Sequence, residues 1–174
     1  EYRHFMKKEM FEQASVLADT TAGRIGDDHI LEAIFGYQAD AIFTQTNNIH
    51  IIACGTSFHS GLVAKYWLEE HAGVPCQVEV ASEYRYRKVP VPAGTLFVTI
   101  SQSGETADTL AALRKAKENN YLGFLAICNV ANSSLVRESN ISLMTMAGVE
   151  IGVASTKAFT TQLVALQLLT LSLG

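Results

Sequence analysis

The chain has 174 residues, 48% of them hydrophobic and 17% charged, and its 13 Lys and Arg against 17 Asp and Glu give a net charge of −4. This length fits one globular domain with a sizeable core, and the composition excludes a disordered or low-complexity protein. The acidic balance disfavours a nucleic-acid-binding surface, which would need a basic patch.

The sequence also carries no sign of a membrane or secretory segment. It opens with no basic stretch followed by an apolar run, and its longest apolar stretch, residues 163–173, is interrupted by polar residues and too short to span a bilayer. Cys54, Cys76 and Cys128 lie in or beside apolar runs, without the CxxC or His spacing of a zinc site. We therefore expect a cytoplasmic protein with reduced core thiols and no metal, cofactor, membrane or nucleic-acid partner.

Residues 1–46 are predicted to form two helices. One face of the first helix carries apolar residues at helical spacing, namely Met6, Met10, Ala14 and Leu17. Two glycines and an aspartate then break the pattern, and a second helical face begins with Ile30, Ala33, Ile34 and Tyr37. Neither helix carries an obvious catalytic group, so we expect both to pack on the outside of an α/β core at residues 47–174.

The core alternates between apolar, β-branched runs and helical patterns. The five strands that we expect are residues 49–54, 76–80, 95–100, 122–128 and 141–146. A nearly continuous apolar run is typical of a strand that is buried on both faces of a parallel sheet. The alternation predicts an α/β fold with a doubly wound, five-stranded parallel sheet, flanked by helices and joined by right-handed crossovers.

Three of the predicted strand-to-helix connections are short and rich in hydroxyl groups. They are residues 55–57 (Gly-Thr-Ser), 101–106 (Ser-Gln-Ser-Gly-Glu-Thr) and 153–157 (Val-Ala-Ser-Thr-Lys). Such residues can be ordinary helix caps and turn formers. They can also form a phosphate site, because the unpaired N–H groups and the dipole of a helix start attract anions. The occurrence of three such loops in one chain favours the second interpretation.

The composition of these loops limits which anion they could bind. None matches the Gly-Lys-Ser/Thr signature of a nucleotide-binding P-loop or the GxGxxG of a dinucleotide site. The first two loops contain no Lys or Arg, so neutral donors and helix dipoles would hold the anion. Arg85 and Arg87 could reach a phosphate, but we expect both to be solvated or ion-paired. A small phosphorylated metabolite fits this chemistry.

Four stretches resemble the glutamine–fructose-6-phosphate aminotransferase family, namely residues 54–57 (CGTS), 81–87 (ASEYRYR), 101–110 (SQSGETADTL) and 150–160 (EIGVASTKAFT). The resemblance runs in the same order from Tyr2 to the end of the chain. It implies the first of that family's two sugar isomerase (SIS) domains, with a flavodoxin-like sheet. It also implies fructose 6-phosphate or glucosamine 6-phosphate as the ligand, and a homodimer formed through the helices of the SIS domains.

The resemblance implies a site residue by residue. It places the phosphate at Ser57, Ser101, Gln102, Ser103 and Thr106, and the sugar beside Thr56, Val153 and Ser155. Cys54 would line the pocket without acting as a nucleophile, because no His or carboxylate near it in the sequence could activate it. Lys157 could form a Schiff base, but a lysine after a Ser-Thr cap is typical of a surface or ion-pairing residue. We therefore expect no catalytic residue in this chain.

The same resemblance implies a larger enzyme, in which a glutaminase domain precedes this chain and a second SIS domain follows it. Both are absent from these residues, so we expect residues 1–174 to form a single SIS domain that supplies the phosphate pocket and is catalytically incomplete alone. An alternative is a free-standing SIS module that senses a sugar phosphate and regulates a partner. A flavodoxin-like electron carrier is disfavoured, because flavin stacking would need aromatic residues in the loops.

Overall fold

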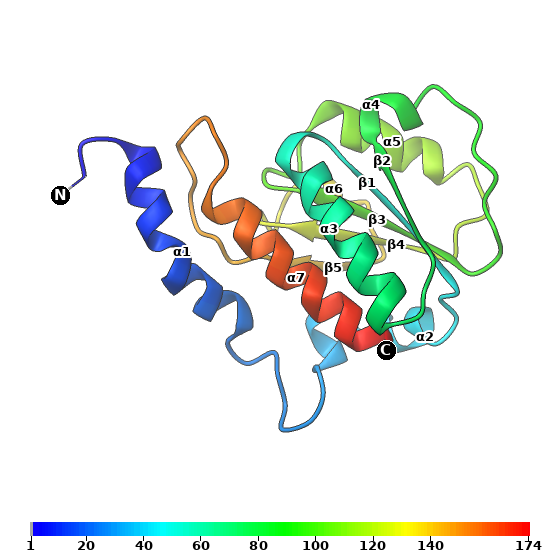
Figure 1. Ribbon diagram of the computed structural model, residues 1–174. Helices are drawn as coiled ribbons and strands as arrows, with labels where there is room; N and C mark the ends of the chain where they lie inside the picture. The colour runs from blue at the N-terminus through cyan, green and yellow to red at the C-terminus, as the bar shows by residue number, and fades with distance from the viewer. Residues whose placement is uncertain (1) are drawn as a thin grey trace.

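The computed structural model describes residues 2–174 (Figure 1). In chain order its elements are α1 (Phe5–Thr21), the 3-10 helix η1 (Glu32–Phe35), α2 (Ala39–Phe43), β1 (Asn48–Ala53), α3 (Gly55–His71), β2 (Cys76–Val80), α4 (Ala81–Tyr84), β3 (Thr95–Ser101), α5 (Ala107–Ala116), β4 (Gly123–Cys128), α6 (Ser134–Arg137), β5 (Ile141–Met144) and α7 (Lys157–Leu173). No helix within residues 2–174 is long and apolar enough to cross a membrane.

The centre of the molecule is a five-stranded sheet in the order β2-β1-β3-β4-β5. All four neighbouring pairs are parallel, with β1 lying between β2 and β3. All five predicted strands are therefore confirmed, to within two residues at either end. The chain moves outward from β1 to β2, then returns to the other side of β1 for β3, so the strand order reverses between β1 and β3.

Helices cover both faces of this sheet, and alternate strand residues point to opposite sides. Ile51 and Val98 pack in one cluster with Leu68 of α3 and Leu166 of α7. Their chain neighbours belong to a second cluster against α4, α5 and α6, which contains Ile52, Phe97, Leu113 and Leu135. Because consecutive strand residues enter different clusters, the sheet is buried on both faces, as the continuous apolar runs predict.

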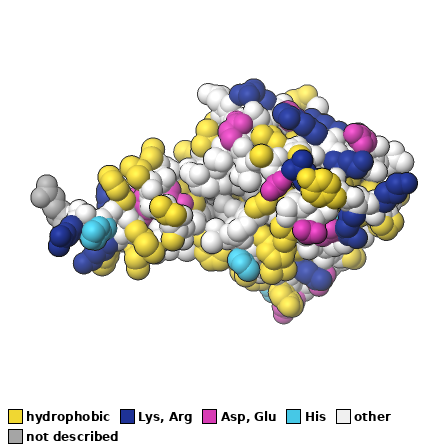
Figure 2. Space-filling view, turned by 90° about the horizontal axis from the view of Figure 1, so that it is seen from above, with side chains coloured by type: hydrophobic (Ala, Val, Ile, Leu, Met, Phe, Trp, Pro, Cys, Tyr) yellow, Lys and Arg dark blue, Asp and Glu magenta, His cyan; other side chains and the backbone are white. Residues whose placement is uncertain are grey.

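Helix α1 packs along the outer side of α7 and forms a narrow projection at one end of the molecule (Figures 1 and 2). The face predicted to be buried is wrong, because Met6 and Met10 are 44% and 51% exposed, and the residues that are buried are Glu9, Val16 and Thr20. Hydrophobic side chains therefore gather on the solvent side of this projection, namely Tyr2, Phe5, Met6, Met10 and Phe11. The apolar spacing correctly predicts a helix but not its packing.

The second predicted helix is also different. Only the 3-10 turn η1 forms around Ala33 and Ile34, and Tyr37 is 92% exposed. Gly36 separates η1 from α2 with a φ of 115°, a conformation outside any right-handed helix. The apolar spacing from residue 30 to residue 37 therefore covers one 3-10 turn and the bend at Gly36, and not a continuous helix.

The leucine-rich face of α7 is wide because the helix packs both on α3 and the sheet and against α1. Leu166, Leu168 and Leu169 are buried with α3 and the sheet, and α1 covers a further side of the helix. Leu171 remains 54% exposed. The breadth of the apolar face is therefore explained largely within the chain itself.

A buried polar network lies beside the amino-terminal half of β1. His50 Nδ1 lies 2.8 Å from the Tyr121 hydroxyl, and its Nε2 lies 3.0 Å from Glu79 Oε1. Arg87 in turn pairs with Glu79 through two hydrogen bonds. His50 is 3% exposed, and this burial lowers its pKa below the usual value despite the neighbouring carboxylate.

This network predicts a pH dependence of stability. An unfolded His has a pKa of about 6.5, so the unfolded chain takes up a proton at a pH where folded His50 does not. The free energy of unfolding is therefore expected to fall as the pH drops through about 6.5 toward the lower pKa of folded His50. Urea denaturation across this window should show the decline, and His50→Gln should flatten it. The same change at His71, which is exposed at the end of α3, should not. Equal slopes in all three proteins would contradict the assignment.

Candidate functional site

Two of the three hydroxyl-rich loops lie side by side at the carboxyl edge of the sheet. Residues 55–57 begin α3 directly after β1, and residues 101–106 join β3 to α5. β1 and β3 are hydrogen-bonded neighbours, with Ala53 opposite Ile100 at their ends. The helices that follow pack on opposite faces of the sheet, so the two loops flank the point where the strand order reverses. This is the position of the ligand crevice expected in an open α/β sheet, and we refer to it as the crevice.

The loop at residues 101–106 is tightly folded by its own hydroxyl groups. Ser101 is 4% exposed, and its Oγ accepts a hydrogen bond of 3.0 Å from the Gly104 N–H. The same Oγ lies 3.3 Å from Thr106 Oγ1, and Ser103 Oγ accepts a 3.2 Å bond from the Glu105 N–H. The loop therefore gathers three hydroxyl groups within a few residues of the start of α5.

The segment around α6 braces this loop from outside. Gly104 O accepts a 3.1 Å bond from the Leu135 N–H, and Glu105 Oε1 accepts a 2.6 Å bond from the Ser134 N–H. This backbone donor lowers the pKa of Glu105. Glu105 thus caps α6 as a carboxylate and does not face the crevice as a base.

The start of α3 provides the second half of the crevice. Ser57 is 8% exposed, whereas Thr56 is open to solvent. The first N–H groups of a helix have no partner within it, so the starts of α3 and α5 both offer free donors and a positive dipole end. Thr109, in the first turn of α5, donates to Cys54 Sγ at 3.9 Å. This contact places the two helix starts next to each other.

The third loop differs from the other two. Glu150 Oε1 accepts hydrogen bonds from the N–H groups of Thr156 at 2.9 Å and Ala158 at 3.2 Å. Ser155 Oγ lies 3.3 Å from the same carboxylate. The start of α7 is therefore filled by an anion from the chain itself, and Val153 projects from this loop fully exposed. This loop can line a ligand but offers no open anion site at its helix.

The basic residues near the crevice are paired. Arg85 Nη1 lies 2.6 Å from Asp108 Oδ1, and Arg87 pairs with Glu79, so the ion-paired interpretation of both is confirmed. Lys157 is only 4% exposed and lies 2.8 Å from Glu12 Oε2. The ion-pairing expectation for Lys157 is confirmed, but it is not a surface residue.

A separate hollow lies at the opposite, amino-terminal edge of the sheet. Its lining includes His50, Cys76, Gln77, Pro92 and Tyr121. The His50 nitrogens are already bonded to Tyr121 and Glu79, and the hollow is lined by the starts of strands instead of the starts of helices. It is therefore a poorer anion site than the crevice. Within residues 2–174 no group of three or more His, Cys, Asp or Glu residues is placed to hold a metal ion.

Comparison with known proteins agrees with this geometry. The SIS domain family matches residues 42–172. The chain is 68% identical over 99% of its length to the glutamine–fructose-6-phosphate aminotransferase (isomerizing) of Pseudomonas putida, and 64% identical over 99% to that of Legionella pneumophila. It spans 28% of the length of these curated relatives.

Solved structures give the same result. The C-terminal domain of glucosamine-fructose-6-phosphate aminotransferase from Francisella tularensis matches with a TM-score of 0.94 and 58% identity, over 97% of this chain and 47% of that one. Tagatose-6-phosphate ketose/aldose isomerase from Escherichia coli matches with a TM-score of 0.74 and 17% identity, over 98% of this chain and 48% of that one, and shares the fold alone. By its sequence match and its sheet order, the chain belongs to the SIS domain family.

Proposed function

We propose that this chain is the first SIS domain of a glutamine–fructose-6-phosphate aminotransferase, and that it binds the phosphate of fructose 6-phosphate or glucosamine 6-phosphate. The whole enzyme would convert fructose 6-phosphate and glutamine to glucosamine 6-phosphate and glutamate. The match over nearly the whole chain to relatives of that name supports this assignment.

The observation that carries the proposal is the meeting of two helix starts at the ends of the neighbouring strands β1 and β3. The two helix starts lie beside a cluster of hydroxyl groups, and Arg85 is held in an ion pair by Asp108 of the first turn of α5. Neutral donors and helix dipoles can bind a phosphate dianion without a cationic clamp. In this proposal the phosphate is held by Ser57, Ser101, Gln102, Ser103 and Thr106.

The sugar would extend from the phosphate toward Thr56 and the third loop. Ser60 on α3 lies 3.3 Å from Gln162 on α7, so the amino-terminal halves of these two helices lie together. This contact brings Thr56 near the loop that carries Val153 and Ser155. We assign these three residues to the sugar.

We assign no catalytic residue to this chain. The acid–base groups of the isomerisation would come from the second SIS domain, and ammonia from a glutaminase domain, both elsewhere in the longer protein. The parent enzyme would act in the cytoplasm as a homodimer formed through SIS-domain helices. The apolar side chains exposed on α1 are consistent with burial against another domain or subunit. Sedimentation velocity at high protein concentration would detect such association.

Calorimetric titration tests the proposed ligand. Fructose 6-phosphate and glucosamine 6-phosphate should each bind the chain at one site per molecule. Unphosphorylated fructose should bind at least about 100-fold more weakly, because it lacks the several charge-assisted hydrogen bonds of the phosphate. Equal affinity for fructose and its phosphate would contradict a phosphate site.

A further inference from the structure

Residues 147–156, which make up most of the connection between β5 and α7, have no regular structure of their own and carry both Val153 and Ser155. The two ends of this loop are fixed by side chains near the sheet and the helix. Asn129 bonds Gly148 O and the Ala147 N–H, both at 2.7 Å, and Glu150 caps α7. Between these two anchors, the middle of the loop has a third support.

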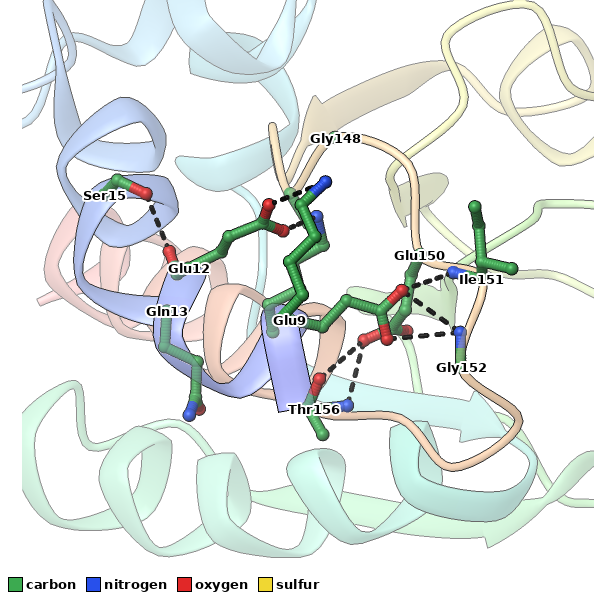
Figure 3. Close-up of polar contacts among 12 residues, drawn as sticks. Glu9, Glu12, Gln13, Ser15, Gly148, Glu150, Ile151, Gly152 and Thr156 are labelled. Atoms are coloured by element: carbon green, nitrogen blue, oxygen red, sulfur yellow. Dashed lines mark hydrogen bonds and ion pairs between the residues drawn. The ribbon is translucent and has the colours of Figure 1, made fainter. Parts of the chain in front are cut away.

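Glu9 of α1 supplies that support (Figure 3). Its carboxylate is directed into the loop, and Oε1 accepts hydrogen bonds from the N–H groups of Ile151 at 2.6 Å and Gly152 at 3.1 Å. Oε2 lies 3.1 Å from the same Gly152 nitrogen. Glu9 is 2% exposed, so these backbone donors replace the water that a free carboxylate would bind.

The fit is close on the loop side as well. A Cβ atom added to Gly152 would lie 2.5 Å from Glu9 Oε2. Any larger residue at position 152 would push the carboxylate out of its place. The contact therefore holds Gly152, the residue directly before Val153, close against α1.

α1 is itself held firmly enough to act as a support. Thr20 Oγ1 donates a 2.5 Å hydrogen bond to Thr145 O, next to the end of β5. Glu12, which Figure 3 shows beside Glu9, pairs at 2.8 Å with Lys157, the first residue of α7. α1 thus contacts both segments that flank the loop, and Glu9 binds the loop itself between these two contacts.

We propose that Glu9 is a positioning residue for sugar recognition. It fixes the position of the 147–156 loop relative to α1, and so places Val153 and Ser155 over the crevice. This inference rests on the proposed function. It assigns the phosphate and the sugar to separately supported parts of the site, since the phosphate loop at residues 101–106 is braced by α6 and the sugar loop by α1.

The test is a comparison of two ligands on two variants. In Glu9→Gln one backbone N–H must face the amide nitrogen, which cannot accept its hydrogen bond. The contact between residue 9 and the loop is therefore weakened, with little change in the shape of the side chain. Gly152→Ala disturbs the same contact from the loop side and serves if the first variant folds poorly. The matched control is Asp19→Asn, which removes one negative charge from an exposed position on the same helix. Affinities for fructose 6-phosphate and for inorganic phosphate are measured by amide NMR titration.

We expect Glu9→Gln to weaken fructose 6-phosphate binding by about 5- to 20-fold and to change phosphate binding by less than about twofold. The amide resonances of Ile151 and Gly152 should shift without ligand, and Asp19→Asn should behave like the unaltered chain. Equal losses for both ligands, or no loss for either, would overturn the inference. Failure of the unaltered chain to bind fructose 6-phosphate would instead overturn the proposed function, and this inference with it.

Discussion

Ser103→Ala is expected to weaken fructose 6-phosphate binding by about 10- to 100-fold, because a hydrogen bond to a charged group contributes about 1.5 to 3 kcal/mol. Ser103 lies in the half-exposed part of the loop, and its hydroxyl accepts only the Glu105 N–H, which can turn to water instead. The variant should therefore unfold at nearly the same urea concentration as the unaltered chain.

Ser101→Ala should lose affinity by a similar factor but at a cost in stability. Its Oγ accepts the Gly104 N–H inside a buried part of the loop. Removal of that acceptor leaves a buried donor unsatisfied, which costs about 1 to 3 kcal/mol. Thr106→Ala should lie between the two, because Thr106 shares the hydroxyl cluster at the start of α5.

Arg85→Ala is the contrast to these serine variants. Its guanidinium is paired with Asp108 in a partly exposed ion pair, which contributes at most about 1 kcal/mol. We expect its loss to leave sugar-phosphate affinity within about threefold. If Arg85→Ala abolished binding while both serine variants kept it, the anion would be held by charge, and the loop assignment would be wrong.

Gly104→Ala is expected to have the largest effect on the fold of the site. Gly104 has a φ of 67°, which costs an L-residue about 1 to 2 kcal/mol. A Cβ atom there would also lie 2.7 Å from Cys128 Sγ and still closer to Ser133. Overpacking of this kind costs about 1 to 3 kcal/mol. We therefore expect a total loss of about 2 to 5 kcal/mol in the free energy of unfolding, together with loss of sugar-phosphate binding.

Gly23→Ala is the matched control for the backbone strain. Gly23 has the same φ of 67°, but a Cβ atom there would meet nothing within 4 Å. This variant should lose only about 1 to 2 kcal/mol and should bind fructose 6-phosphate normally. Urea denaturation of both variants gives the comparison. If Gly104→Ala were no worse than Gly23→Ala, the segment around α6 would not brace the loop.

The sheet could be predicted from the sequence because its signal is local. The runs around Ile51, Val98 and Leu125 are apolar at consecutive positions, which is typical of a strand buried on both faces. The carboxyl ends of neighbouring parallel strands meet at one edge of a sheet, so the juxtaposition of residues 55–57 and 101–106 could be predicted too.

The packing of α1 could not be predicted in this way. Its buried side carries Glu9 and half-buried Glu12, and each has a partner more than 140 positions away in the chain. A periodicity argument takes such carboxylates for a solvated face, because the groups that compensate them are distant in the chain: backbone N–H groups of Ile151 and Gly152 for Glu9, and the Lys157 ammonium for Glu12. For the same reason, the role of Glu9 emerges only when the loop and the helix are seen together.

Amide NMR of the labelled chain during titration with fructose 6-phosphate tests the central claim most directly. We expect the largest saturable shifts at the N–H groups of Ser103, Gly104 and Glu105 and at the start of α3. The Gly104 and Glu105 N–H groups bond the hydroxyls of Ser101 and Ser103, which are assigned to the phosphate, so they should report its binding. Shifts concentrated around His50, Gln77 and Tyr121 would place the ligand in the hollow at the opposite edge of the sheet, and would contradict the assignment of the phosphate to the crevice between β1 and β3.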